Sequence, residues 1–299
     1  MSRKVIIDTD PGLDDAVAIL FALASGKFEV LGLTTVAGNI GLAKTTTNAG
    51  GLLSVMQRSD IPVISGADVP LLRDGIDAIV VHGDDGLRGV TLPKPGRSAR
   101  TGAVDWLAET LLAHPSGTVD VLALGPLTNI ARLVDEHPAA AGRIGQLIVM
   151  GGAVDEPGNV GPNSEFNFAC DPEAAAVVLH ADIRTTIIPL DVTRRVRAGR
   201  DYVEALRGTP AGTVSADVLT AYLIDGKESR PLHDPCVMLL ALEPDLFGVE
   251  LLRLAVDLGD DADAGALKRS ASGSPVNVAM TVDVERALAL LAEGLRRPA

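Results

Sequence analysis

The chain has 299 residues, with 26 Lys or Arg against 39 Asp or Glu, so its formal net charge at pH 7 is −13. Hydrophobic residues make up 47% and aromatic residues 3%, which supplies a large aliphatic core and excludes a disordered chain. The negative charge argues against nucleic acid or an anionic membrane as a partner, and it is compatible with cation binding.

Cysteine usage and hydropathy bear on the cellular compartment. Cys170 and Cys236 are too few for a disulfide framework in a chain of this length, which is typical of a reducing compartment. No apolar stretch of signal-peptide length comes before the first charges, and the longest apolar run, 16–25, is too short to span a bilayer. We therefore expect a cytoplasmic protein without a membrane partner.

Short β-rich runs alternate with helical patterns along the first 190 residues. Strands are predicted at 5–9, 28–36, 119–124, 146–150 and 185–190, and helices at 13–24, 42–57, 106–113, 127–134 and 174–180. This alternation predicts an α/β fold with a mixed, mostly parallel sheet that is flanked by helices on both faces.

The alternation stops after residue 190. Residues 191–245 have helical patterns, two late strands are predicted at 249–258 and 276–283, and a last helix is predicted at 284–295. Residues 259–274 have the composition of a surface loop. Since no linker or repeat interrupts the chain, we predict one domain over residues 1–299, with a mainly helical insertion at about 191–245.

Ligands of parallel α/β sheets bind beyond the carboxyl ends of the strands, so the residues after each strand are the candidates for a site. The Gly- and Pro-rich stretches 82–102 and 151–163 are candidate active-site loops.

Four carboxylates, Asp8, Asp10, Asp14 and Asp15, follow the first strand within eight residues. Capping of the next helix accounts for one or two of them. Like charges about 4 Å apart repel by roughly 4 kcal/mol at an effective dielectric of 20, a cost that a bound cation removes. Ca²⁺ takes roughly six to eight oxygen ligands. We favour a metal site, in which Asp14 and Asp15, about 100° apart on a helix, take different roles.

Two further strand ends carry polar groups. Gly125-Pro126 opens a turn that could direct the Leu124 carbonyl into a site, although a plain turn fits equally well. The loop with Asn159, Glu165 and Asn167 offers amides and a carboxylate but no basic residue, which suits sugar hydroxyls better than phosphate. Asn-rich loops are also common as simple turns.

Two histidines are candidate catalytic groups. His233-Asp234-Pro235 precedes an apolar helix, so Asp234 could be its N-cap. Alternatively, His233 donates a proton and Asp234 joins the metal ligands. His82 is the second candidate. The remaining residues of this kind are interpreted as structural: Cys170, Cys236, His114, His137, His180 and Asp171.

Taken together, these motifs resemble the inosine–uridine-preferring nucleoside hydrolase family. The matching segments occur in order from Asp8 to Pro235, and the ordered set is far more specific than any one motif. They are Asp8-Thr9-Asp10-Pro11-Gly12-Leu13-Asp14-Asp15-Ala16, Thr34-Thr35-Val36-Ala37-Gly38-Asn39, His82-Gly83-Asp84-Asp85-Gly86-Leu87, Gly125-Pro126-Leu127-Thr128-Asn129, Met150-Gly151-Gly152, Glu165-Phe166-Asn167 and His233-Asp234-Pro235.

The resemblance implies a role for each candidate residue. It implies Ca²⁺ held by Asp10, Asp15, the Leu124 carbonyl and Asp234, with Asp14 as general base. It implies ribose binding by Asn39, Asn159, Glu165 and Asn167, with His233 as leaving-group acid and His82 as a residue on the base side. It further implies a homotetramer or homodimer.

The sequence departs from the family on the nucleobase side. The segment 221–232 lacks the regularly spaced aromatic and amide residues of many relatives, which leaves Tyr222 as the expected base contact. Arg88 stands where a Gly is common.

The implied function is Ca²⁺-dependent hydrolysis of a ribonucleoside, such as uridine or inosine, to ribose and free base. One alternative is hydrolysis of a modified ribonucleoside or another ribosyl compound, and a second is a non-catalytic nucleoside-binding protein. A phosphatase with a strand-Asp-x-Asp start is disfavoured, because no Lys stands at a strand end.

Overall fold

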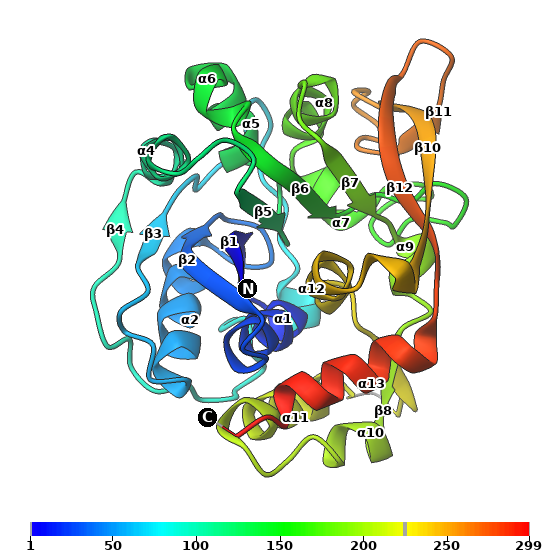
Figure 1. Ribbon diagram of the computed structural model, residues 1–299. Coiled ribbons are helices and arrows are strands. Elements are labelled where there is room, and N and C mark those ends of the chain that lie inside the picture. Colours follow the sequence, from blue (N-terminus) through cyan, green and yellow to red (C-terminus); the bar gives the residue numbers. More distant parts are fainter. Residues whose placement is uncertain (1, 224–225, 299) are drawn as a thin grey trace.

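A computed structural model describes residues 2–223 and 226–298 (Figure 1). Ten strands of this part of the chain form one sheet in the order β11-β10-β12-β7-β6-β5-β1-β2-β3-β4. Pairing is parallel from β12 to β4 and antiparallel where β10 meets β12 and β11. The strands are β1 (Arg3–Thr9), β2 (Phe28–Thr35), β3 (Val63–Ser65), β4 (Arg100–Thr101), β5 (Val119–Ala123), β6 (Ile144–Met150), β7 (Thr185–Ile188), β10 (Phe247–Val256), β11 (Leu267–Arg269) and β12 (Ser274–Val282).

Helices cover both faces of the sheet (Figure 1). One layer holds α1 (Leu13–Ala24), α2 (Leu42–Val55), α11 (Pro210–Tyr222), α12 (Pro235–Leu242) and α13 (Val284–Leu295). The other holds α4 (Ala103–Ala113), α5 (Thr128–Glu136), α6 (Pro138–Ala141) and α8 (Pro172–His180). Successive β1 residues point to opposite faces, so Val5 and Ile7 pack in the first core and Ile6 in the second. The predicted mostly parallel α/β fold is confirmed.

One prediction about the later part of the chain needs correction. Residues 259–274 are not entirely loop, because β11 pairs with β10 at the edge of the sheet. Lys268 and Arg269 are exposed on this short edge strand, and their charges give it the composition of a loop. Residues 191–245 are mostly helical, but they also contain a two-stranded antiparallel sheet of β8 (Arg197–Gly199) and β9 (Ser229–Pro231).

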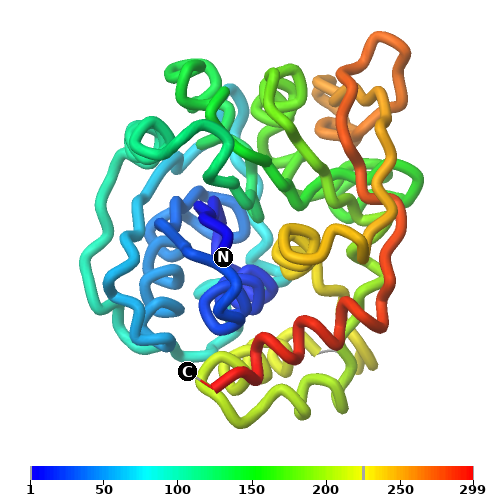
Figure 2. The backbone as a smooth tube through the Cα atoms, viewed as in Figure 1, coloured from blue at the N-terminus to red at the C-terminus, as the bar shows by residue number. Residues whose placement is uncertain are grey.

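The segment after β7 folds back onto the rest of the molecule. In Figure 2, α13 runs beside the segment that holds α10 (Arg200–Glu204) and α11, although they lie far apart in sequence. Their buried side chains share one apolar cluster with α1 and the central strands. Among the described residues, no helix has both the length and the apolar character needed to cross a membrane.

The topology fixes where a ligand site can form. From β1 the chain adds β2, β3 and β4 on one side, and it then returns to place β5, β6 and β7 on the other side. The two directions meet between β1 and β5, and this switch point is where crevices open beyond the carboxyl ends of parallel strands. The residues after Thr9 and Ala123 therefore lie at the natural ligand site of this fold.

Candidate active site

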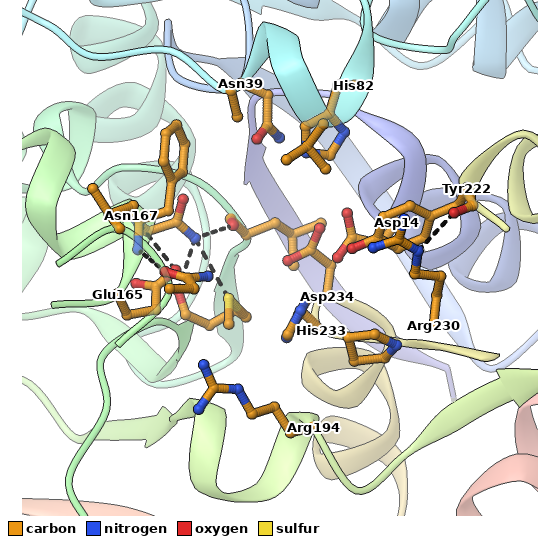
Figure 3. Close-up of a pocket in the computed structure, with 18 of the residues that line it drawn as sticks. Asp14, Asn39, His82, Glu165, Asn167, Arg194, Tyr222, Arg230, His233 and Asp234 are labelled. Carbon is orange, nitrogen blue, oxygen red and sulfur yellow. Dashed lines mark hydrogen bonds between the residues drawn. The ribbon is translucent and has the colours of Figure 1, made fainter. Parts of the chain in front are cut away.

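A cavity of about 560 Å³ opens beyond the carboxyl ends of the central strands (Figure 3). Ten of the twelve predicted site residues line it, namely Asp14, Asn39, His82, Leu124, Asn159, Glu165, Asn167, Tyr222, His233 and Asp234. The other two, Asp10 and Asp15, are fully buried close to its floor. Residues far apart in the sequence are thus brought together in one pocket.

The acidic end of the pocket is built on the first turn of α1. The Thr9 hydroxyl donates to one carboxylate oxygen of Asp15 (2.6 Å), and the Gly12 amide donates to the other (3.0 Å). Asp14 lies beside it in the same turn. Single oxygens of Asp14, Asp15 and Asp234 lie within 4.8 Å of one another. Hard cations bind to carboxylate oxygens of this kind.

Asp10 is not in this trio, but Asn39 ties it to Asp15. The Asn39 amide N–H donates to Asp10 (2.7 Å), and the Asn39 side chain donates to the Asp10 carbonyl (3.2 Å) and to Asp15 (3.1 Å). A Cβ at Gly38 or Gly125 would lie only 2.2 or 2.3 Å from an Asp10 oxygen. Both glycines are therefore required for Asp10 to occupy its place.

Helix capping does not account for Asp234. It occupies the N-cap position of α12 with Pro235 as the first helical residue, yet its side chain makes no capping hydrogen bond among the described residues. The carboxylate instead joins Asp14 and Asp15.

Burial and mutual repulsion disfavour the charged forms of these carboxylates. Burial and then the charge of Asp15 raise the pKa of Asp14 to about 7. Burial and then the charge of Asp15 raise the pKa of Asp10 well above the usual range. Burial and then the charge of Asp14 do the same for Asp234. A divalent cation would relieve this strain, and the all-oxygen donor set fits a hard one.

Two of the sugar-binding candidates, Glu165 and Asn167, lie together on the opposite wall (Figure 3). Glu165 caps α7 (Phe166–Cys170), and it accepts hydrogen bonds from the backbone amides of Gly152, Asn167 and Phe168. The Asn167 side chain donates to the Leu124 carbonyl (2.7 Å) and to the Met150 carbonyl (3.1 Å). These bonds direct the Leu124 carbonyl toward the site and leave the Asn167 side-chain oxygen as an acceptor.

Both candidate histidines are neutral at neutral pH. Burial and then Arg194 lower the pKa of His233 to about 3, while burial and then Arg88 lower that of His82 to about 4. The Leu13 amide donates to His82 Nδ1 (3.1 Å), so the ring proton of His82 lies on Nε2. His233 Nδ1 lies 2.7 Å from the Thr193 hydroxyl, which fixes the ring. Each ring offers only the N–H of neutral imidazole.

The two residues expected on the nucleobase side form an aromatic wall. The rings of His82 and Tyr222 are nearly parallel, with centroids 6.5 Å apart and an interplanar angle of 24°. Of the 221–232 segment discussed above, Ile224 and Asp225 lie outside the described residues. Arg88 has φ of 49°, in the left-handed region that favours Gly, and it donates to the carbonyls of Val80 and Val81.

Most of the predicted active-site loop 82–102 lies outside the pocket. Residues 151–163 do contribute Asn159 and Val160 to the pocket, but among the described residues of 82–102 only His82 lines it. Pro93 and Pro95 of that stretch instead lie against Gly50 and Gly51 of α2. Composition alone therefore identified a loop and not its location.

Four basic residues of the pocket, Arg194, Arg197, Lys227 and Arg230, were not predicted. They come from the stretch that begins just after α9 (Leu190–Thr193) and ends in β9, away from the strand ends that the sequence analysis followed. The only signal was the local run Arg194-Arg195-Val196-Arg197 in an acidic chain.

Comparisons with known proteins agree with this site. The family described as inosine-uridine preferring nucleoside hydrolase matches residues 5–289. A pyrimidine-specific ribonucleoside hydrolase RihA of Salmonella agona is 37% identical, over 99% of each chain. Among solved structures, a plant nucleoside hydrolase, PpNRh1, has a TM-score of 0.93 at 34% identity over the whole of both chains. A purine-preferring ribonucleoside hydrolase from Gardnerella vaginalis has a TM-score of 0.90 at 27% identity over 98% of both chains.

The fold and site define a glycosidase, an enzyme that hydrolyses an N-glycosidic bond. More narrowly, the chain belongs to the inosine-uridine preferring nucleoside hydrolase family, and its substrates are small ribonucleosides. The family is metal-dependent, and the acidic trio is where this chain could bind the ion.

Proposed function

We propose that the enzyme uses Ca²⁺ to hydrolyse pyrimidine or purine ribonucleosides, such as uridine and inosine, to ribose and free base. The observation that carries the proposal is the buried carboxylate trio at one end of a cavity whose other wall offers amides and a carboxylate. The trio suits a hard cation, and the facing groups suit sugar hydroxyls.

Asp10, Asp15, Asp234 and the Leu124 carbonyl would hold the ion. All four donors are oxygens. An ion would offset the burial that raises the pKa of all three carboxyls and the repulsion from neighbouring carboxylates that adds to it at Asp10 and Asp234. Bound there, Ca²⁺ would supply positive charge for the sugar diol and would modestly acidify water.

Asp14 would act as the general base. Its carboxylate lines the cavity, and a pKa of about 7 is close to the pH at which the enzyme would work. Water adds its oxygen to C1′ of the sugar and gives one proton to Asp14. Asn39, Asn159, Glu165 and Asn167 would hold the ribose while positive charge develops on it.

The departing base takes the electron pair of the C1′–N bond and a proton. His233 is the candidate donor, since Thr193 orients its ring, and His82 Nε2–H is the alternative. His82 and Tyr222 would flank the planar base. Attack by water on the face opposite the base would invert C1′.

The relatives differ in the base that they prefer, because their names include both pyrimidine-specific and purine-preferring enzymes. Hydrolysis of a modified ribonucleoside is the second candidate, since four unpredicted basic residues line the same pocket.

A panel of uridine, cytidine, inosine, adenosine and guanosine tests the proposal, with ribose release and free base measured before and after chelation. We expect release that the chelator abolishes and Ca²⁺ restores. Ca²⁺ binding without release from any of the five nucleosides would instead favour a nucleoside-binding protein or an unusual substrate.

The homotetrameric or homodimeric state and the cytoplasmic location stay predictions. Light scattering on the purified protein and cell fractionation test them.

A further inference from the structure

The short helix α9 contacts both a loop of the pocket and a catalytic candidate. At its start, the Leu190 amide donates to the Gly152 carbonyl (2.9 Å), and at its end the Thr193 hydroxyl lies 2.7 Å from His233 Nδ1. Between them lies Asp191, which is only 3% exposed and takes no part in the mechanism proposed above. Burial of a carboxylate is costly unless it is hydrogen-bonded, so the partners of Asp191 indicate what it does.

Asp191 accepts three hydrogen bonds from the backbone of one loop. The Val154 amide donates to one carboxylate oxygen (2.9 Å), and the amides of Asp155 (2.7 Å) and Glu156 (3.2 Å) donate to the other. Residues 154–156 belong to no helix or strand, so the regular hydrogen bonds of such elements do not hold these amides. The carboxylate therefore fixes three consecutive residues of the loop onto α9.

The anchored residues lead into the sugar-binding candidates. We call residues 154–164 the sugar loop, because it carries Asn159 and ends just before Glu165. The loop closes on itself where the Asn159 amide donates to the Ser164 carbonyl (3.0 Å). The Asn159 side-chain oxygen also accepts from the Phe166 amide (2.9 Å), at the start of α7. Since the loop is tied together in this way, its attachment to α9 determines where Asn159 lies.

Arg194, the residue that follows α9, is a second anchor of the sugar loop. Its guanidinium donates to the carbonyls of Pro157 (2.6 Å) and Gly158 (2.8 Å). Figure 3 shows this side chain at the margin of the pocket. Asp191 holds backbone amides of the loop, and Arg194 holds the carbonyls that come next, so five consecutive residues, 154–158, are fixed by α9.

We propose that α9 positions the sugar loop for ribose binding, with Asp191 as its main anchor and Arg194 as the second. Asp191 does not line the pocket, so it acts through Asn159 and not on the ligand itself. The inference rests on the proposed hydrolase function, in which Asn159 contacts the ribose. One short helix then serves both ends of the substrate, because its Thr193 also orients the candidate leaving-group acid.

Amide hydrogen exchange tests the anchor without any substrate. Asp191→Asn nearly keeps the shape of the side chain, but it removes the charge and leaves one oxygen for three amides. A hydrogen bond to a charged group is worth about ten- to hundredfold in an equilibrium, so exchange of the Val154, Asp155 and Glu156 amides should accelerate at least about tenfold. Parent-like exchange at all three amides would overturn the anchoring role.

Ribose binding tests whether the anchor serves the sugar. In Asp191→Asn, we expect the affinity of the Ca²⁺-loaded protein for D-ribose to fall and KM for uridine to rise about tenfold each, with kcat and uracil affinity within about threefold. Parent-like ribose affinity, or a fall in kcat with KM unchanged, would contradict the proposal. Absence of uridine turnover in the parent protein would refute the hydrolase function, whereas exchange and ribose binding would still decide the role of Asp191.

Asp171→Asn is the matched control for a merely structural effect. Asp171 is also buried, and it accepts from the amides of Leu71 (2.9 Å) and Ala174 (3.0 Å) and from the Thr128 hydroxyl (2.7 Å), all outside the sugar loop. This variant should be destabilised about as much in a denaturant titration but keep ribose affinity within about threefold. If it loses as much ribose affinity as Asp191→Asn, the effect is one of general stability and the proposal is wrong.

Arg194→Lys keeps the proposal testable if Asp191→Asn fails to fold. Lys keeps the positive charge but not the planar fork that reaches two carbonyls, so ribose affinity should fall at least about threefold. The control Arg195→Lys makes the same change at an exposed neighbour outside the pocket and should keep the parent affinity. Equal ribose affinity in Arg194→Lys and the parent would show that α9 does not position the loop in this way.

Discussion

Replacement of Asp14 by Asn removes one proton acceptor and very little else. The two side chains have the same shape, and Asn keeps an oxygen that can lie beside Asp15 and Asp234. Two backbone hydrogen bonds hold the first turn of α1, from the Gly12 amide to Asp15 and from the Leu13 amide to His82. Neither uses the Asp14 side chain, so the turn should persist. Asp14→Asn therefore tests the general base and leaves the metal ligands and the sugar wall in place.

The magnitude follows from the environment of the carboxylate. Burial and Asp15 bring the pKa of Asp14 to about 7, which is the range in which a base is both deprotonated and able to accept a proton. General bases contribute about 10²- to 10⁴-fold. At 1.36 kcal/mol per factor of ten, this loss corresponds to about 3 to 5 kcal/mol of transition-state stabilisation.

Steady-state ribose release measures the effect at saturating Ca²⁺. We expect kcat to fall about 10²- to 10⁴-fold, with KM and Ca²⁺ affinity within about threefold of the parent values. The matched control is Asp77→Asn, which changes a carboxylate of the same pocket outside the buried trio and should keep kcat within about threefold. Near-normal turnover of Asp14→Asn would refute the assignment.

Three more outcomes are expected. Asp10→Ala should weaken Ca²⁺ binding by at least about tenfold. If calorimetry shows an unchanged Ca²⁺ affinity, Asp10 is not a ligand of the metal site. Thr193→Val should lower kcat about five- to tenfold with little change in KM, because His233 loses its Nδ1 partner, whereas Thr193→Ser should retain activity. Chelator-treated protein should lose stability between pH 7 and 8 in denaturant titrations. There, carboxyls with raised pKa values, such as Asp14, bind more protons folded than unfolded, whereas His82 and His233 are mostly neutral in both states. Stability that rises over this interval would contradict the pKa assignments.

The local hydrophobic pattern of the sequence was sufficient to predict most of the sheet, because the central strands are long enough to bury continuous apolar runs. Residues 5–9 and 119–124 were predicted in this way, and their carboxyl ends led directly to Asp10, Asp14 and Leu124. The predicted helices of the first 190 residues are all present, with ends shifted by a few residues. Topology then brought the predicted side chains into one cavity.

Very short helices and strands could not be predicted from the local hydrophobic pattern. β3 and β4 have three and two residues, which is too few for a period to be detected. The same holds for β8 and β9, whose pairing joins residues on either side of α11. That pairing is long-range, and it is what brings Arg197 alongside Ser229. The four basic residues of the pocket were missed because their charges gather only in the folded chain.

A Ca²⁺ titration of chelator-treated enzyme, with bound Ca²⁺ and ribose release from uridine or inosine followed together, tests the central claim most directly. We predict no release without the ion and a rate that rises in proportion to the occupancy of one site. Hydrolysis at the full rate without Ca²⁺, or full occupancy with no ribose released from either nucleoside, would contradict the account.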